Sequence, residues 1–439
     1  MNVAEIVNAA FLYALSLIAF AFYLYKKYKT NGYILSICNA YIFQYALILF
    51  VVTPMAFTPK AWIKLLGNAA YARAPLFYPY LLKSIELNCL GFFIFIIALS
   101  VFEFSKKKHG DLYKKIERTV RFTPKILLDT EFLLAMIIWV LYSLFVIGGF
   151  NLFGASGNSE SGLIYYINQA TQVIINMTTL FYGISYINKK HNLFFFVLGI
   201  IACILMGKRA TLIMDILWGI VVYALYRKVS LSKKVFKKAV KYAVLLVIVA
   251  LAIGEVRSSS TDFTIVENLI YGNTFCDIRD GGMILYGFKN NAYEEWALGR
   301  TYLSALLSFI PSSLSALRLK WDWGRYSTTT LLGWKNHPGL RGGWAMEGYL
   351  NFGVLGIVLA QIISAKIYAD MEKYFYMEMF EKEKRKISEK AVLTLYIYIT
   401  LARRATCSAG FFAVYVLVLL GAINRLIGRI LEDKRSVWL

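Results

Sequence analysis

The chain has 439 residues, of which 59% are hydrophobic and only 17% are charged, whereas soluble domains have about 45–50% apolar and about 25% charged residues. This composition excludes an ordinary soluble enzyme and is typical of a protein embedded in lipid. The formal net charge of +22 would favour nucleic acid as the partner of a soluble chain. In a membrane protein it reflects the usual basic bias of cytoplasmic loops, so no nucleic acid is expected.

Apolar runs recur along the whole chain, each close to the ~20 residues that a transmembrane helix needs. They predict an all-α, polytopic membrane bundle of about eleven spans, since sheet edges exposed to lipid could not satisfy their backbone hydrogen bonds. In chain order, the expected spans are 3–25, 33–54, 85–104, 132–150, 163–187, 192–206, 211–226, 242–254, 348–368, 391–402 and 411–428.

Loop charge predicts the orientation of this bundle. The loops after the odd-numbered spans, together with the C-terminal tail, carry 30 lysines and arginines, and the loops after the even-numbered spans carry 17. Cytoplasmic loops are the more basic ones. The N-terminus and the long segment 255–347 are therefore expected outside the cytoplasm, and the tail inside.

The long segment 255–347 departs from a simple array of helices and short loops. It contains an apolar stretch, 301–319, which Pro311 interrupts. Counting this stretch as a span would reverse the loops that follow, against the charge rule, so we expect an interfacial or re-entrant helix. A cysteine at Ser327 is expected to react with a membrane-impermeant reagent. One membrane domain with three parts follows: an N-terminal bundle over 1–254, an extracytoplasmic loop subdomain over 255–347, and C-terminal helices with a cytoplasmic tail over 348–439.

A stripe of amides marks the fifth expected span. Asn168, Gln172 and Asn176 recur every four residues, so they share one helix face. Such a stripe could bind sugar hydroxyls, but it more often joins neighbouring helices through hydrogen bonds, and the latter role is favoured here.

Basic residues gather at the outer helix ends and in the long segment. Guanidinium groups suit bidentate binding of phosphate oxygens, and charge at membrane depth is costly and usually functional. The alternative is that each is a helix-end charge that reaches back to the interface. As a group they predict an anion site formed by Lys208, Arg209, Arg257, Arg300, Arg341, Arg403 and Arg404.

Two residues near the end of the long segment could accept a proton. His337 is the only histidine expected outside, and Glu347 begins the next span. Neighbouring arginines would keep the imidazole neutral and able to accept a proton. The alternatives are a turn-capping role for His337, and a helix-dipole carboxylate or an ion pair with Arg341 for Glu347. The next candidates are Asp277, Asp280 and Glu295.

No motif indicates a metal or a nucleotide. The five cysteines form no CxxC pair and there are only three histidines, so neither a disulfide framework nor a zinc site is expected. The chain also lacks the Walker A, GxSxG and HExxH patterns that mark nucleotide, hydrolase and zinc-protease sites. We therefore expect no cofactor and no chemistry driven by cytosolic ATP.

Four segments in the second half of the chain share a pattern with one family. They are Gly207-Lys-Arg209; Gly299-Arg-Thr-Tyr302 with Phe309-Ile-Pro311; Gly342–Gly343 followed by Glu347-Gly-Tyr-Leu-Asn-Phe-Gly353; and Arg403-Arg-Ala-Thr406. The combination resembles the Wzy-type polymerases of O-antigen and capsule repeat units. Glycine and serine, which usually follow the late arginine, are replaced here, so either Arg403 or Arg404 corresponds to it.

The resemblance implies a helical bundle of the GT-C type in a bacterial inner membrane, with its active site facing outward. It implies metal-independent glycosyl transfer between oligosaccharides carried on undecaprenyl diphosphate, with a flippase and a chain-length regulator as possible protein partners. The arginines would stabilise the leaving diphosphate, Tyr302 and Tyr349 would line the site, and Glu347 or His337 would act as the base. An O-antigen ligase is the nearest alternative. A polysaccharide flippase or other transporter and a membrane scaffold are the alternatives from other classes; the lack of internal repeats disfavours the transporter.

Overall fold

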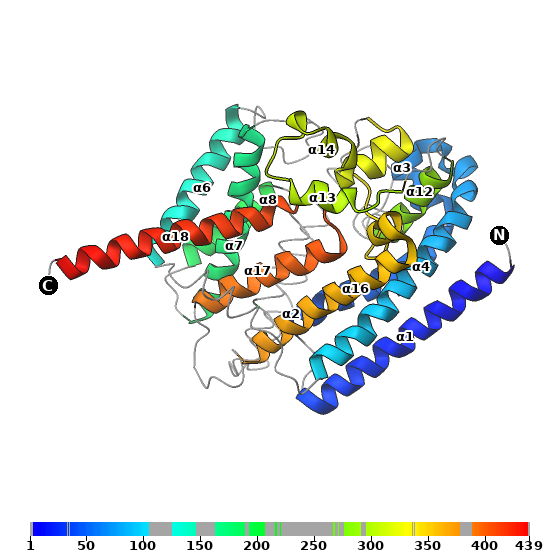
Figure 1. Cartoon of the computed structure of the whole chain (residues 1–439), viewed down its shortest axis with the longest axis horizontal. Coiled ribbons are helices and arrows are strands. Elements are labelled where there is room, and N and C mark those ends of the chain that lie inside the picture. Colours follow the sequence, from blue (N-terminus) through cyan, green and yellow to red (C-terminus); the bar gives the residue numbers. More distant parts are fainter. Residues whose placement is uncertain are drawn as a thin grey trace.

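The computed structural model describes residues 3–32, 34, 36–104, 125–145, 163–188, 193–206, 216, 220, 267, 271, 276–290, 296–335, 337, 339–377 and 389–437. Every secondary-structure element in these ranges is helical (Figure 1). This confirms the predicted all-α class. The predicted site residues Lys208, Arg209 and Arg257 lie outside the described residues, as does Glu295.

Five stretches of the described chain are long and apolar enough to cross a membrane, and they indicate a multi-pass membrane protein. They are Val3–Asn31, Cys38–Phe57, Ala70–Phe104, Leu128–Phe145 and Met346–Tyr376. The first, third and fifth are helices α1, α4 and α16; the second combines α2 (Ile37–Leu47) with the turns that follow it; the fourth lies in α6 (Lys125–Phe145).

Four further helices coincide with expected spans. They are α7 (Leu163–Asn188), α8 (Leu193–Leu205), α17 (Glu389–Thr406) and α18 (Phe412–Val437). The expected spans 211–226 and 242–254 lie outside the described residues except for positions 216 and 220. The number of spans therefore stays a prediction.

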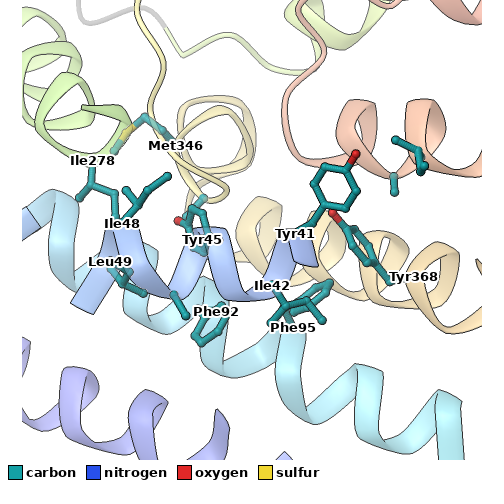
Figure 2. Close-up of a cluster of buried hydrophobic side chains, with 14 of the residues drawn as sticks. Tyr41, Ile42, Tyr45, Ile48, Leu49, Phe92, Phe95, Ile278, Met346 and Tyr368 are labelled. Atoms are coloured by element: carbon teal, nitrogen blue, oxygen red, sulfur yellow. The ribbon is translucent and has the colours of Figure 1, made fainter. Parts of the chain in front are cut away.

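The helices pack as a row, in which α1 contacts α4, α4 contacts α16, α16 contacts α17, and α17 contacts α7 with α6 and α8 beyond it (Figure 1). Aromatic side chains fill the contact of α2, α4 and α16 (Figure 2). Tyr45 stacks on Trp344 with ring centroids 4.1 Å apart, and Phe95 meets the same tryptophan at 5.0 Å. Ile278 and Met346 lie beside Ile48 in this cluster (Figure 2), so the core extends directly to the elements of the candidate site.

Helix α4 begins much earlier than expected. The expected spans leave segment 55–84 as a loop, but α4 runs from Ala70 through Pro75 and Pro79. Its 35 residues give a length of about 52 Å, well beyond the ~30 Å hydrocarbon core of a bilayer. The extension supports α12 (Asp277–Asn290), a helix that was not predicted. A Cβ at Gly282 would lie 2.9 Å from the Leu81 Cα, so α12 packs on α4 backbone to backbone.

The early part of α4 defines one end of the bundle, which we call the loop end; it also carries α12 and residues 296–345. The apolar stretch 301–319 lies here in short pieces: α13 (Arg300–Leu306), a 3₁₀ turn (Ser312–Leu314) and most of α14 (Ala316–Trp321). The first piece ends at Leu306, before Pro311, and no piece is long enough to span a membrane. Leu303 and Leu306 are about half exposed, so α13 presents an apolar side outward. Ser327, the predicted labelling position, is buried and was a poor choice.

Helix α16 contains a sharp break. Phe352 and Gly353 have non-helical dihedral angles, and Gly353 has a positive φ of 61°. The turn before the break folds back so closely that a Cβ at Gly348 would lie 2.7 Å from the Gly356 carbonyl oxygen. We call residues 346–351 the hook. The Leu350 carbonyl at its end accepts a hydrogen bond from the Ala297 N–H at 2.9 Å.

The opposite end of the bundle holds a buried charge cluster. Lys27 Nζ lies 3.2 Å from Glu103 Oε1 and 3.0 Å from Glu372 Oε1, with all three side chains almost fully buried. The amine also donates to Asn39 Oδ1 at 3.1 Å, and the Tyr23 hydroxyl donates to Glu103 at 2.8 Å. One cation and two carboxylates therefore join α1, α2, α4 and α16.

Candidate functional site

Glu347 in the hook joins three segments that are distant in sequence. Thr301 Oγ1 donates a hydrogen bond to Glu347 Oε1 at 2.8 Å, and the Ser408 N–H donates to Oε2 at 2.7 Å. The Ser408 hydroxyl also donates to Oε1. The glutamate is 1% exposed. Each of these hydrogen bonds offsets part of the free-energy cost of burying the carboxylate. Glu347 therefore fixes α13 and the α17–α18 turn to the hook.

Asn351 reinforces this junction. Its Nδ2 donates to Thr301 Oγ1 and to the Glu347 carbonyl, both at 2.8 Å, and its Oδ1 accepts from the Gly299 N–H at 2.7 Å. Gly299 has a φ of 82°, which glycine adopts without strain. The segments bearing the Gly299, Glu347 and Arg403 motifs therefore meet at one hydrogen-bonded junction, which we call the clasp.

The predicted arginines border the clasp from different elements. The Arg300 guanidinium lies over the Trp321 ring with Cζ 4.8 Å from the centroid, and that of Arg403 lies 4.9 Å from the centroid of Tyr41. Such cation–π contacts orient a guanidinium without neutralising it. Arg404 turns back toward the α17–α18 turn, where its guanidinium lies against Gly410.

Arg341 forms a pair that the sequence did not reveal. Its Nε lies 3.1 Å from Asp277 Oδ1 at the start of α12, and its Nη2 donates to Cys276 Sγ at 3.3 Å. The ion pair with Arg341, one of the alternatives for Glu347, is not found among the described contacts, in which Thr301 and Ser408 bond the glutamate. Asp277 raises the pKa of Arg341 further above its usual range. Burial raises the pKa of Asp277, and the attraction of Arg341 offsets this only in part.

A second acidic residue of α12 lies behind this pair. Asp280 Oδ1 accepts from Arg279 Nη2 at 2.8 Å and from Nε at 3.2 Å, and Arg279 also donates to the Ala61 carbonyl. Both side chains are almost fully buried. Cys276 Sγ donates to Asp280 Oδ2 at 3.2 Å, and burial raises the pKa of this thiol to about 12. This inner pair is charge-balanced and serves to hold α12 in place.

Cys407 shows that the clasp and the Arg341–Asp277 pair are neighbours. Burial, and after it Glu347 and Asp277, raise the pKa of its thiol to about 12, and Arg404 opposes them. A thiol that responds to charges from the hook, α12 and α17 lies among them.

His337 is held by its own turn. Its Nδ1 accepts a hydrogen bond from the Gly339 N–H at 3.2 Å, and its ring lies 5.6 Å from that of Trp334. Burial lowers the pKa of His337, and Asp280 opposes this effect. A neutral imidazole that accepts at Nδ1 carries its hydrogen on Nε2, so in this geometry His337 presents a donor. The turn-capping alternative describes this contact.

The two predicted tyrosines are close in sequence to the clasp residues Thr301 and Glu347. The Tyr302 hydroxyl is buried and finds no hydrogen-bond partner in the described part of the chain; burial, and then Glu347, raise its pKa. Tyr349 packs edge-on against Trp296, with ring centroids 5.7 Å apart. Their predicted role in binding substrate is neither supported nor opposed by these contacts.

The amide stripe of α7 joins helices at one position. Asn176 Oδ1 accepts from Cys203 Sγ of α8 at 3.3 Å, as the favoured interpretation predicts.

Sequence reasoning missed Asp277 as the partner of Arg341, and it missed Ser408 as a partner of Glu347. Asp277 begins a helix with acidic residues in its first turn and Lys289 in its last, a pattern that could have identified α12. Ser408 carries no comparable signal.

Among the described residues, no group of three or more His, Cys, Asp or Glu side chains could hold a metal ion.

Comparisons with models of protein families, with characterised proteins and with solved structures find no match for this chain. The fold and the site therefore define a class, a multi-pass helical membrane protein with a charged site at one end of the bundle. Any narrower assignment depends on the site itself.

Proposed function

We propose that this protein polymerises oligosaccharide repeat units carried on undecaprenyl diphosphate into O-antigen or capsular polysaccharide. The clasp is the observation that carries the proposal. Segments around Gly299, Glu347 and Arg403, which the family resemblance identifies independently, are joined through the buried carboxylate of Glu347. Segments that form one site must lie together, and three unrelated loops would not be expected to bond to the same buried carboxylate.

The chemistry follows from the charges around the clasp. A sugar diphosphate needs no nucleotide site, since the diphosphate is itself the leaving group. Arg300, Arg341 and one of Arg403 and Arg404 would bind the diphosphate and stabilise the negative charge that develops on it. Loop charge assigns the loop end to the extracytoplasmic side, where a lipid-linked repeat unit would be delivered by a flippase.

Deletion of the gene in its host, followed by gel analysis of surface polysaccharide, tests the proposal. We expect single repeat units in place of a polymer ladder, restored by the wild-type gene and not by an Arg341→Lys variant, which keeps the charge but loses the planar donor fork. Lys83→Met, at an exposed pair on α4, is the matched control and should restore the ladder.

Other outcomes would assign another function. Loss of all sugar from the lipid core would indicate a ligase, and repeat units held on the cytoplasmic side would indicate a flippase. An unchanged ladder in the deletion strain would contradict every polysaccharide role.

A further inference from the structure

The two groups that the sequence favours as proton acceptors are already occupied. Both oxygens of Glu347 receive hydrogen bonds from Thr301 or Ser408, and the residue is buried. The Nδ1 lone pair of His337 accepts the Gly339 N–H. His337 could therefore accept a proton at Nδ1 only by breaking that hydrogen bond, and Glu347 is almost wholly enclosed by protein.

Asp277 differs from both in access. Its side chain is 22% exposed, and that of Arg341 is 49% exposed. The Oδ1 atom, 3.1 Å from Arg341 Nε, is buried. Oδ1 therefore lies on the buried side of the pair, and the exposed fraction of the side chain belongs to its other atoms.

The charges that face Asp277 come from every element around it. Within α12, Arg279 and Asp280 neutralise each other, and Cys276 is a neutral thiol. The hydroxyl of Tyr45 in α2 and the thiol of Cys407 are also within electrostatic reach of Asp277.

Arg341 is the cation that pairs directly with Asp277. It favours the ionised carboxylate, while burial favours the protonated one. A carboxylate set between these two influences is suited to gain and release a proton.

We propose that Asp277 is the general base of this site, a role that rests on the function proposed above. Asp277 Oδ2 takes the proton of the acceptor hydroxyl as that oxygen bonds to the anomeric carbon of the donor sugar. The bond from this carbon to the diphosphate oxygen breaks, and its electron pair leaves with the diphosphate. Arg341 orients the carboxylate and, together with Arg300 and with Arg403 or Arg404, receives the leaving group.

The test is elongation by the purified full-length protein, using the lipid-linked repeat unit extracted from the host deleted for this gene. Asp277→Asn keeps the size of the side chain but cannot accept the proton, so kcat should fall about 100- to 10,000-fold with KM nearly unchanged. Burial raises the pKa of Asp277, so the wild-type rate should fall on acidification at a pH above the usual ~3.9 of an aspartate. The residual rate of Asp277→Asn should not show this fall, and Asp277→Glu should keep part of the rate together with the fall.

Asp322→Asn is the matched control, because Asp322 is also a loop-end aspartate beside an arginine, Arg318, at 3.6 Å. It should elongate at the wild-type rate. Melting in detergent must show that each variant is folded. A folded Asp277→Asn variant that elongates normally, or that is impaired only in KM, overturns the role as base. A wild-type protein that forms no polymer contradicts the proposed function instead.

Discussion

Replacing Lys27 by methionine tests whether the buried charge cluster holds four helices together. The change removes the cation whose Nζ lies 3.2 Å from Glu103 and 3.0 Å from Glu372. Breaking a buried pair from one side costs about 3–5 kcal/mol, and since this change breaks two pairs we expect the upper half of that range. With an unfolding entropy of about 2.1 cal/mol/K for each of the 439 residues, Tm should fall by about 4–5 °C.

The assay is thermal unfolding of the purified protein in detergent. A triple variant that adds Glu103→Gln and Glu372→Gln removes all three charges and should recover at least half of the loss, because an uncharged replacement of a buried ion pair is often neutral. Lys83→Met is the control, since Lys83 and Glu86 form an exposed pair worth less than about 1 kcal/mol. A Lys27→Met variant as stable as the wild type, or a triple variant less stable than the single one, would refute the reasoning.

Three further predictions concern the loop end. Glu347→Gln loses the charge-assisted bonds from Ser408 and should cost about 1–3 kcal/mol in thermal unfolding; an inactive variant of unchanged stability would instead favour Glu347 as the base. Burial lowers the pKa of His337, so near the usual pKa of ~6.5 the unfolded chain binds more protons at this residue than the folded chain does. Acidification from pH 7.5 to 5.5 should therefore lower the Tm of the wild type by more than that of His337→Gln. Equal falls in Tm would contradict this. A cysteine at Thr329, which is exposed, should react with an impermeant thiol reagent in cells whose inner membrane is intact, and labelling only after that membrane is opened would reverse the orientation.

Helix positions could be predicted from the sequence wherever an apolar run was uninterrupted. Spans expected at 132–150 and 348–368 overlap α6 and α16, because burial or lipid contact along a whole helix leaves a continuous apolar signal. The first part of α4 was missed because Pro75 and Pro79 are usual helix breakers, although here the helix continues through both.

The candidate site was less predictable, because it depends on contacts between distant segments. The partner of Arg341 lies 64 positions earlier in the chain, and only the packing of α12 on α4 brings Asp277 to it. Glu347 was correctly singled out, but its neighbours could not be known without the hook. A charge in the sequence shows that a partner is needed and does not show which one is used.

The hydrogen bonds of the clasp can form only in the order in which their residues are synthesised. Thr301 is synthesised before Glu347, so its hydroxyl can meet the carboxylate as soon as the hook folds. Ser408 follows 61 residues later, and α17 must be synthesised before it. Until then the glutamate at the start of α16 lacks the donors that Ser408 supplies. The nascent chain therefore keeps an incompletely bonded carboxylate during the synthesis of α17, and the α17–α18 turn completes its hydrogen bonds.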